Sequence, residues 1–397
     1  MSRKVQLVLW IVLVTVVSAL QPEKNSSSQS NLIPRTFSGI QICNFVKCNS
    51  SQQKMSRQGF NGNCSKNSRS YEAVKVSETA RQYLTSVWMT LVIPFVYTFV
   101  FTASLPLNLL AILIFLFKIG FRNPTVIYMT NLAVADLLFV LLLPPKISYH
   151  FLGNDWEFGS FVCQLVTGSF YTYMYCSVLL MMCISIDRFL AVVYPIKSST
   201  WRTQGRVVAL CLIMWLLAIC GAMPFFLTEQ AVYVIDLNIT TCHDVLPLSV
   251  LQRYSVYYVP SLCIVFFVIP LTVTAVCYAS IISTLHSQSI VNQYGKRHAF
   301  FLAIIVLSVF VVCFTPTNII LLIHYLHFSQ GPSDSLYFVY ILSVCVGSVS
   351  CCLDPLIYYY ASSMFQKQLH HVLHSVKVES FQVRELMNKM ETFTPHP

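Results

Sequence analysis

Charged side chains are rare in the apolar parts of this chain, and each of them could do chemistry there. Asp136, Lys146, Asp187, Arg188 and Asp354 lie within or at the ends of long apolar segments, in a chain whose charged residues make up only 10%. A charge within a membrane is costly and usually functional. These five positions are therefore the first candidates for a site.

Two of these residues, Asp136 and Asp354, lie in different apolar segments and could meet as a pair of carboxylates. Two carboxylates that share one proton form the catalytic unit of aspartyl proteases. An intramembrane aspartyl protease is therefore one hypothesis, although a remote one, because each aspartate also has a simpler polar setting.

The simpler setting is a polar network within the membrane. Asn108 and Asn131 are placed to hydrogen-bond Asp136, and Asp354 precedes a proline that frees backbone carbonyls. A Na⁺ ion held by Asp136, Asp354 and Ser177 is an equally open expectation beside a network of hydrogen bonds alone. No other metal site and no other cofactor is expected.

The cysteines divide by their position along the chain. Cys163 and Cys242 are both predicted on the outer side of a membrane, where disulfides persist. We expect them to pair, with two free thiols as the alternative. Cys43, Cys48 and Cys64 lie in the N-terminal tail, and one of them stays unpaired if the other two join.

Composition places most of the chain in a membrane. Of 397 residues, 56% are apolar, against roughly 45–50% in soluble domains, and charged residues are far below the usual share of about 25%. The net charge of +10 forms no continuous basic face, which argues against nucleic-acid binding. Seven apolar segments are long enough to span a membrane, at about 88–117, 124–149, 160–193, 204–228, 254–285, 298–328 and 333–361.

Basic residues in the short loops predict the orientation of these spans. The loops after spans one, three and five hold Lys118, Arg122, Lys197, Arg202, Arg206, Lys296 and Arg297, whereas the loops after spans two, four and six hold only Arg253. By the positive-inside rule, the first set is cytoplasmic and the N-terminus is extracellular. Residues 363–374 form an amphipathic stretch that suits a helix on the membrane surface.

The N-terminal part of the chain has the pattern of a secreted tail. Residues 1–19 begin with basic side chains, continue with a short apolar core and end with small residues, which is typical of a signal peptide; an extra membrane helix is the alternative. The polar residues that follow, to about 85, predict a disordered extracellular tail. Glycosylation sequons occur at Asn25, Asn49, Asn63 and Asn238.

Together these features resemble the rhodopsin-like G-protein-coupled receptors. The resemblance covers about residues 88–375, and its motifs occur in every span: Asn108, Asn131-Leu-Ala-Val-Ala-Asp136, Cys163, Asp187-Arg188-Phe189 with Tyr194-Pro195, Trp215, Pro270, Tyr278, Cys313-Phe-Thr-Pro316 and Asp354-Pro355-Leu-Ile-Tyr358. It implies an all-α membrane protein of the plasma membrane: a seven-helix bundle with a short eighth helix, and not an enzyme.

Three departures from the family pattern point to one subfamily. Phe189, Phe314 and Asp354 replace the usual Tyr, Trp and Asn. With the segments 239–245 and 350–363, they resemble the protease-activated receptors, closest to the thrombin-receptor type. The resemblance implies that an extracellular serine protease cuts the tail and that the new N-terminus acts as a tethered agonist. A receptor for a free diffusible peptide is the alternative.

The tail contains a sequence that suits such a cut, Leu32-Ile33-Pro34-Arg35-Thr36-Phe37. Arg35 supplies the basic residue that trypsin-like proteases need, and the preceding proline stiffens an extended substrate. Cleavage here would divide a propeptide, 20–35, from a tail, 36–87, whose tethered ligand is Thr36, Phe37, Ser38, Gly39, Ile40 and Gln41. Competing basic residues are Lys47, Lys54, Arg57, Lys66 and Arg69.

The resemblance also implies the ligand pocket and the switch. The pocket would be lined by Tyr171, His243, Asp244, Leu246, His324, Tyr325, Tyr337 and Tyr340, with Asp244 receiving the new ammonium group. The switch and G-protein coupling would use Asp187 paired with Arg188, together with Tyr278, Phe314, Pro316, Asp354, Pro355 and Tyr358.

The implied partners are an extracellular protease, a heterotrimeric G protein and arrestin. Thrombin is plausible as the protease, but residues 40–70 contain no Asp or Glu that could dock on its basic exosite. The cytoplasmic tail, 362–397, has few phosphate acceptors, so weak arrestin recruitment is expected.

Overall fold

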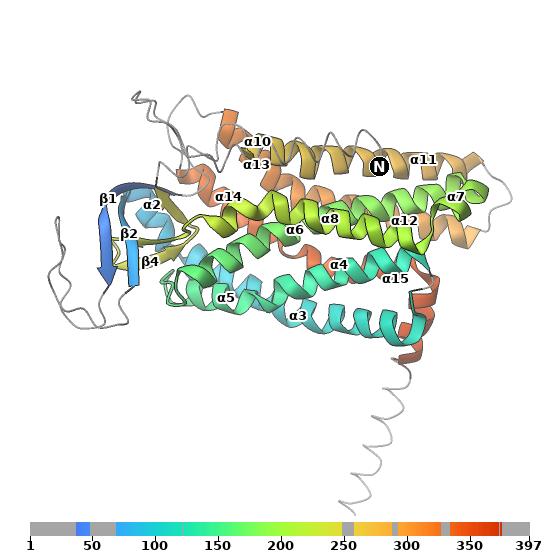
Figure 1. The fold of residues 1–397 in the computed structure, drawn as a ribbon, viewed down its shortest axis with the longest axis horizontal. Helices are drawn as coiled ribbons and strands as arrows, with labels where there is room; N and C mark the ends of the chain where they lie inside the picture. Colours follow the sequence, from blue (N-terminus) through green and yellow to red (C-terminus); the bar gives the residue numbers. More distant parts are fainter. Residues whose placement is uncertain are drawn as a thin grey trace, which may run out of the picture.

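The computed structural model describes residues 37–47, 69–121, 123–247, 258–287, 293–326, 334–372 and 374. Within these residues, seven helical spans are long and apolar enough to cross a membrane, and they lie alongside one another (Figure 1). Their bounds are Glu78–Ile119, Pro124–Phe151, Ser160–Val193, Gln204–Leu227, Ser261–His286, His298–Leu321 and Asp334–Ala361. The seven expected spans are therefore confirmed, with shifts at several ends.

Of the first four spans, only the first contains π-helical turns, and the other three are α-helical. The first contains α2 (Glu78–Leu84), the π-helical η1 (Trp88–Val92), α3 (Ile93–Leu113) and the π-helical η2 (Ile114–Ile119). The second contains α4 (Pro124–Leu141) and α5 (Leu143–Phe151), the third is α6 (Ser160–Val193), and the fourth is α8 (Gln204–Leu227). The short α7 (Pro195–Trp201) links the third and fourth.

The last three spans are interrupted near their prolines. The fifth contains α10 (Tyr258–Cys263), η3 (Ile264–Val268) and α11 (Ile269–Ser287), and the sixth contains α12 (Gln293–Val309), η4 (Phe310–Phe314) and α13 (Thr315–Leu326). The seventh contains α14 (Asp334–Gly347) and α15 (Ser350–Ala361). Proline removes a backbone donor, and wide turns at such positions are typical of functional helices.

The start of the first span differs from the sequence prediction. The helix begins at Glu78 rather than near Trp88, because Ser77 caps it by accepting a hydrogen bond from the amide of Ala80 at 3.0 Å. A serine followed by an acidic first turn is the local signal for this start. The polar composition of the segment hides this signal from a search for apolar runs.

A small sheet covers the extracellular end of the bundle, at the end opposite α7 and the C-terminal red part of the ribbon (Figure 1). Its five strands have the order β4-β3-β2-β1-β5. Their bounds are β1 (Phe37–Lys47), β2 (Arg69–Val76), β3 (Ala231–Val234), β4 (Ile239–Cys242) and β5 (Val245–Pro247). The tail thus contributes two strands, and the loop between spans four and five contributes three.

The expectations for the outer loops and the ends of the chain have mixed outcomes. Asn238 is exposed in the turn between β3 and β4, while Asn25, Asn49 and Asn63 lie outside the described residues. Residues 363–372 are helical, as expected for the eighth helix, and Phe365 is buried against Phe115 and Tyr358. The proposed signal peptide also lies outside the described residues.

The expected disulfide is present between Cys163, near the start of α6, and Cys242 at the end of β4. Both cysteines are buried, in a small cluster with Tyr149 and Trp156. The bond ties the outer sheet to the third span, and the amide of Trp156 adds a backbone hydrogen bond to Thr240 at 2.7 Å. The loop that carries β3, β4 and β5 is therefore fixed at two points.

We expect Cys163→Ser and Cys242→Ser each to lower the amount of receptor at the cell surface several-fold, because the loop loses its covalent anchor. Ligand binding at the outer surface should fall with it. The double variant should be no worse than either single variant, since both remove the same bond. Flow cytometry of a tagged receptor measures this, and additive losses would contradict the pairing.

Candidate functional site

A cavity lies between the extracellular ends of the helices and beneath the loop that follows Cys242. Five of the eight predicted pocket residues line it: Tyr171, His243, Asp244, Tyr337 and Tyr340. The side chains of the other three, Leu246, His324 and Tyr325, lie outside the described part of the chain. The structure therefore brings together residues from α6, α14 and the loop, which are more than 70 residues apart in the sequence.

Among the lining residues that were not predicted as part of the pocket, three carry a titratable group: Tyr97 in α3 and Lys146 and His150 in α5. Lys146 had a clear signal, because it is a charge near the end of an apolar segment. Tyr97 and His150 had none, since an aromatic side chain in a span is most often ordinary packing.

Asp244 is the charged centre of this cavity. Its Oδ2 accepts hydrogen bonds from the Tyr149 hydroxyl at 2.7 Å and from Lys146 Nζ at 3.3 Å, and its Oδ1 accepts one from the Tyr337 hydroxyl at 3.3 Å. Burial alone would raise the pKa of the Asp244 carboxyl, but Lys146, His150 and Tyr149 outweigh that effect and hold its pKa below the ordinary value. Asp244 is therefore a buried anion at neutral pH.

A chain of hydroxyl and imidazole groups forms the other wall. The hydroxyl of Tyr171 lies 3.0 Å from His243 Nε2 and 3.0 Å from the hydroxyl of Tyr340, and His243 Nδ1 lies 2.8 Å from Gln230 Oε1. His243 has a φ of 69°, in the left-handed region that few residues other than glycine adopt. Its position is thus set by its partners as well as by the chain.

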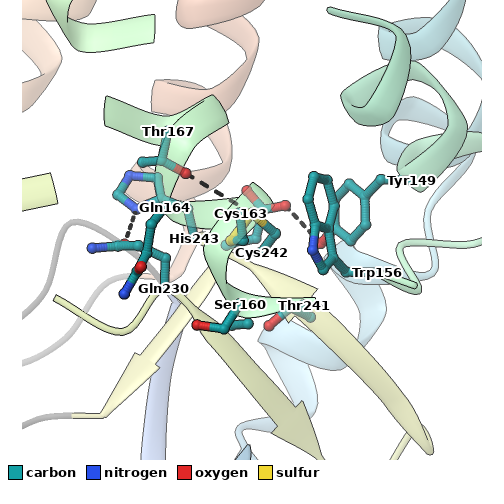
Figure 2. The surroundings of a disulfide bond; sticks show 12 residues. Tyr149, Trp156, Ser160, Cys163, Gln164, Thr167, Gln230, Thr241, Cys242 and His243 are labelled. Atoms are coloured by element: carbon teal, nitrogen blue, oxygen red, sulfur yellow. Dashed lines mark hydrogen bonds between the residues drawn. A yellow bond between two sulfur atoms is a disulfide. The ribbon is translucent and has the colours of Figure 1, made fainter. Parts of the chain in front are cut away.

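Figure 2 shows how the disulfide positions this wall. Cys242 is the residue before His243, and its sulfur lies 3.8 Å from the Thr167 hydroxyl on α6. On the other side of the disulfide, the rings of Tyr149 and Trp156 pack edge to face with centroids 5.8 Å apart. The bond therefore holds His243 and Asp244 over the cavity at the mouth of the bundle.

The segment after the predicted cleavage site lies beside the same loop. β1 runs parallel to β5, with Phe37 opposite Val245, Ser38 opposite Leu246 and Gly39 opposite Pro247. On its other edge it pairs antiparallel with β2, from Gly39 opposite Val76 to Lys47 opposite Arg69. Four of the six residues of the predicted tethered ligand follow Phe37 in this strand, while Arg35 and Thr36 lie outside the described residues.

Within the membrane, the polar network is built around the backbone that Pro355 frees. The carbonyl of Cys351, four residues before the proline, accepts hydrogen bonds from Asn108 Nδ2 at 2.9 Å and from the Ser104 hydroxyl at 3.1 Å. The Tyr358 hydroxyl joins the network, donating to Asn108 Oδ1 at 3.3 Å and to Asp136 Oδ2 at 3.1 Å. Spans one, two and seven are thereby connected.

One expectation for this network is wrong. Asn131 does not hydrogen-bond Asp136. Its Oδ1 accepts a hydrogen bond from Trp215 Nε1 at 3.1 Å, and its amide group donates to the Ile127 carbonyl. Its position on α4 turns it toward α8 rather than toward the centre of the bundle. Asn108 does not contact Asp136 directly either, but the Tyr358 hydroxyl bridges the two side chains.

Four oxygens of the predicted cation site are buried without a hydrogen-bond partner among the described residues. They are Oδ1 of Asp136, Oγ of Ser177 and both carboxylate oxygens of Asp354. The two carboxyl groups also lie close enough to share a hydrogen bond when one of them is protonated, so these oxygens lack a partner only when both groups are ionised. Hard oxygen donors of this kind suit a small cation, and an unpartnered polar atom in such a place is otherwise costly.

At the cytoplasmic end, the expected pair between Asp187 and Arg188 does not form. Asp187 is instead held by Arg202, from the loop after α7, through Nε at 2.6 Å and Nη2 at 2.7 Å. The Thr125 hydroxyl donates to the same carboxylate at 2.7 Å. Arg202 provides a planar fork that matches both carboxylate oxygens, which an adjacent arginine on the same helix does not.

Arg188 is left facing the interior. Its Nε is buried without a hydrogen-bond partner in the part of the chain that the structure describes, as is the hydroxyl of Tyr278 on α11. The sixth span is held elsewhere: His298 Nδ1 lies 3.2 Å from the carbonyl of Tyr360, and its Nε2 lies 3.1 Å from Gln366 Nε2. The sixth span thus packs on the seventh and the eighth helix.

The remaining switch residues lie where the sixth and seventh spans approach. Phe314 is buried at the end of η4, two residues before Pro316, and the Thr315 hydroxyl donates to the carbonyl of Phe310 at 2.8 Å. A side chain at Gly347 would come within 2.9 Å of the Cys313 carbonyl, so the two spans touch closely there. A small cavity lined by Phe314 and Gly347 adjoins this contact.

Comparisons with known proteins agree with this architecture. Residues 107–358 match the family of 7 transmembrane receptors (rhodopsin family). The chain is 54% identical over 303 residues to proteinase-activated receptor 1 of Xenopus laevis, covering 76% of this chain and 71% of the relative. It is 52% identical over 299 residues to proteinase-activated receptor 1 of Homo sapiens, covering 75% and 70%.

A second type of relative is similar over the same extent. Proteinase-activated receptor 2 of Rattus norvegicus is 39% identical over 300 residues, which cover 75% of each chain. The seven spans, the loop disulfide and these similarities lead to one conclusion: the chain is a multi-pass plasma-membrane protein that belongs to the rhodopsin family of seven-transmembrane receptors and, within it, to the proteinase-activated receptors.

Proposed function

We propose that a serine protease activates this receptor by cutting after Arg35, and that the new N-terminus, Thr36-Phe37, is its tethered agonist. The carrying observation is the position of β1, which begins one residue after Thr36 and pairs with β5 at the mouth of the cavity. A peptide that adds a strand to an exposed edge gains affinity from its main chain.

The cavity chemistry fits this ligand. A free α-amine is largely protonated at neutral pH, and Asp244 is the buried anion next to β5. The side chain of Phe37 would meet an aromatic wall that includes Tyr171 and Tyr340. Receptors for a diffusible peptide and intramembrane aspartyl proteases are not favoured, because the chain belongs to a family of protease-activated receptors.

Signal transmission is a shift of population toward the state that binds the agonist more tightly. We infer that the agonist loosens the contact between spans six and seven at Phe314 and Gly347, and that the sixth span then leaves Tyr360 and Gln366. Arg188 and Tyr278, which are close together and buried, would then face a heterotrimeric G protein.

A Na⁺ ion is proposed for the cluster of Asp136, Ser177 and Asp354. Three carboxylate oxygens and one hydroxyl oxygen without other partners fit a hard monovalent cation. The ion would offset one of the two negative charges of the facing carboxylates and so favour the packed, resting bundle. Asp354 replaces the asparagine usual in the wider family, which adds one negative charge to this cluster.

Two finer expectations about partners remain proposals. Thrombin is a plausible activating protease, and arrestin recruitment is expected to be weak because the tail, 362–397, has few phosphate acceptors. A tethered agonist cannot diffuse away, so removal of the receptor from the surface would end the signal.

The cleavage assignment is tested with Arg35→Ala. We expect this variant to lose its response to protease by about two orders of magnitude or more in dose, because trypsin-like enzymes need the basic side chain. Added Thr-Phe-Ser-Gly-Ile-Gln peptide should activate it like the unchanged receptor. The measurement is calcium release in transfected cells, with Arg57→Ala as the matched control. A full protease response in Arg35→Ala would refute the site.

The docking of thrombin is tested through the basic tail. Residues 40–70 carry no Asp or Glu, so we expect cleavage to need more thrombin than an acidic docking segment would, and blocking the exosite should change the rate less than about twofold. The tail variant Lys47→Glu/Lys54→Glu should be cut faster. A large loss of rate on exosite blockade of the unchanged receptor would contradict this account.

The cation proposal is tested with Asp354→Asn. In the unchanged receptor, replacing NaCl by an organic-cation chloride should raise peptide potency by about fivefold, because the resting state loses its ion. Asp354→Asn should abolish this dependence, whereas Ser343→Ala, which removes a buried hydroxyl elsewhere in the seventh span, should keep it. Equal salt dependence in Asp354→Asn would exclude the site.

A further inference from the structure

Lys146 is already paired with the Asp244 carboxylate, to which we propose that the ammonium group of the agonist binds. Its Nζ lies 3.3 Å from Asp244 Oδ2 and 3.2 Å from the Cys242 carbonyl, and 4.7 Å from the centre of the Tyr149 ring. Tyr149 and Tyr337 are the other two side chains that hydrogen-bond the Asp244 carboxylate in the described part of the chain, and we call the three its shell. The resting receptor therefore presents a neutral ion pair to the incoming ligand, rather than a free anion.

The Lys146 contact is the exchangeable member of this shell. The Lys146 and Tyr337 contacts, both 3.3 Å, are longer than the roughly 2.7–2.9 Å of a strong charge-assisted hydrogen bond, whereas the Tyr149 contact is 2.7 Å. Of the two longer contacts, only that of Lys146 comes from a cation, which another cation can replace. The Lys146 side chain is 18% exposed, against 5% for Asp244. A lysine ammonium is compact and well hydrated on a flexible stem, so it can move into water at the end of a span.

Two ammonium groups cannot share Asp244 without cost. The site is poorly accessible to water, so repulsion between two cations on one carboxylate is only weakly screened. Only one of them is neutralised by the single negative charge. A second cation therefore binds well only if Lys146 leaves.

The register of the sheet brings the ligand to this point. β1 and β5 are parallel with Phe37 opposite Val245, and Asp244 directly precedes Val245. In a parallel ladder both strands advance together, so continuing this register by one residue in the cleaved chain would bring Thr36 opposite Asp244. Residue 36 is also the one that acquires the free ammonium group on cleavage after Arg35.

We propose that Lys146 is a resident counter-ion of Asp244 that the new N-terminal ammonium must displace, so that Lys146 sets the threshold of the tethered agonist. This inference rests on the proposed function. Before cleavage the backbone at residue 36 carries no charge and cannot compete. After cleavage it can, and Lys146 withdraws from Asp244 and from the Cys242 carbonyl. Removing Lys146 therefore sensitises the receptor specifically to a charged N-terminus.

The test compares two synthetic peptides on the full-length receptor in cells: Thr-Phe-Ser-Gly-Ile-Gln with a free amine, and the same peptide N-acetylated. Lys146→Met should raise the potency of the free-amine peptide by about tenfold and leave that of the acetylated peptide unchanged. Lys146→Arg keeps the charge and should not sensitise. Lys75→Met removes an exposed lysine from β2 without contact to Asp244 and is the matched control.

Asp244 completes a double-mutant cycle. Asp244→Asn should reduce the free-amine peptide to the potency of the acetylated one, and adding Lys146→Met to Asp244→Asn should change nothing further. If Lys146→Met does not reach the surface because it leaves a buried carboxylate without its cation, Lys146→Gln retains a donor without the charge and should give the same sensitisation.

The outcomes distinguish the proposed role of Lys146 from the proposed activation by a tethered agonist. An equal shift for both peptides, or no shift for the free-amine peptide at normal surface expression, overturns the role of Lys146. Failure of the free-amine peptide to activate the unchanged receptor at all, with the receptor present at the surface, overturns the proposed function instead.

Discussion

Polar atoms that are buried in a membrane must find their partners within the protein, and this constraint organises the receptor from one side to the other. Pro355 leaves the Cys351 carbonyl without its helical donor, and Asn108 and Ser104 of the first span supply the missing hydrogen bonds. Tyr358 extends the same network to Asp136. The carbonyl that Pro355 leaves unpaired in the seventh span is thus the centre of the hydrogen bonds that connect spans one, two and seven.

The same constraint acts at both ends of the bundle with charged pairs. Outside, Asp244 is buried with Lys146 and two tyrosines, and inside, Asp187 is buried with Arg202 and Thr125. Neither pair is between neighbours in the sequence. Each ties a loop to the helices beneath it, so a ligand or partner that changes one pair also moves a loop relative to the bundle.

The extracellular loop between spans four and five is held at several points, and it is where we propose that the agonist binds. The Cys163–Cys242 disulfide fixes it to the third span, the Trp156 amide fixes it to the segment between spans two and three, and the tail strands β1 and β2 pair with β5 and β3. The disulfide and the Trp156 amide hold this loop independently of the ligand segment, which lowers the entropic cost of binding. By contrast, the cytoplasmic end of the sixth span is held to the seventh span and the eighth helix by hydrogen bonds of His298 and by the ring contact of Phe301 with Tyr360.

The sequence by itself determined the seven spans, their orientation and the loop disulfide. Long apolar runs, basic residues in loops and the extracellular position of two cysteines can each be read from short stretches of sequence, without knowing which helices pack together. Through a resemblance to a receptor family, the sequence also identified five of the residues that line the cavity, and the cleavage site at Arg35 stays a prediction. Tertiary structure decided the partners. Arg202 rather than Arg188 binds Asp187, Asn131 accepts a hydrogen bond from Trp215 rather than bonding Asp136, and Lys146 is the cation that pairs with Asp244. The direction in which a side chain faces, and the segment it meets, depend on how helices distant in sequence pack, and no local pattern contains that information.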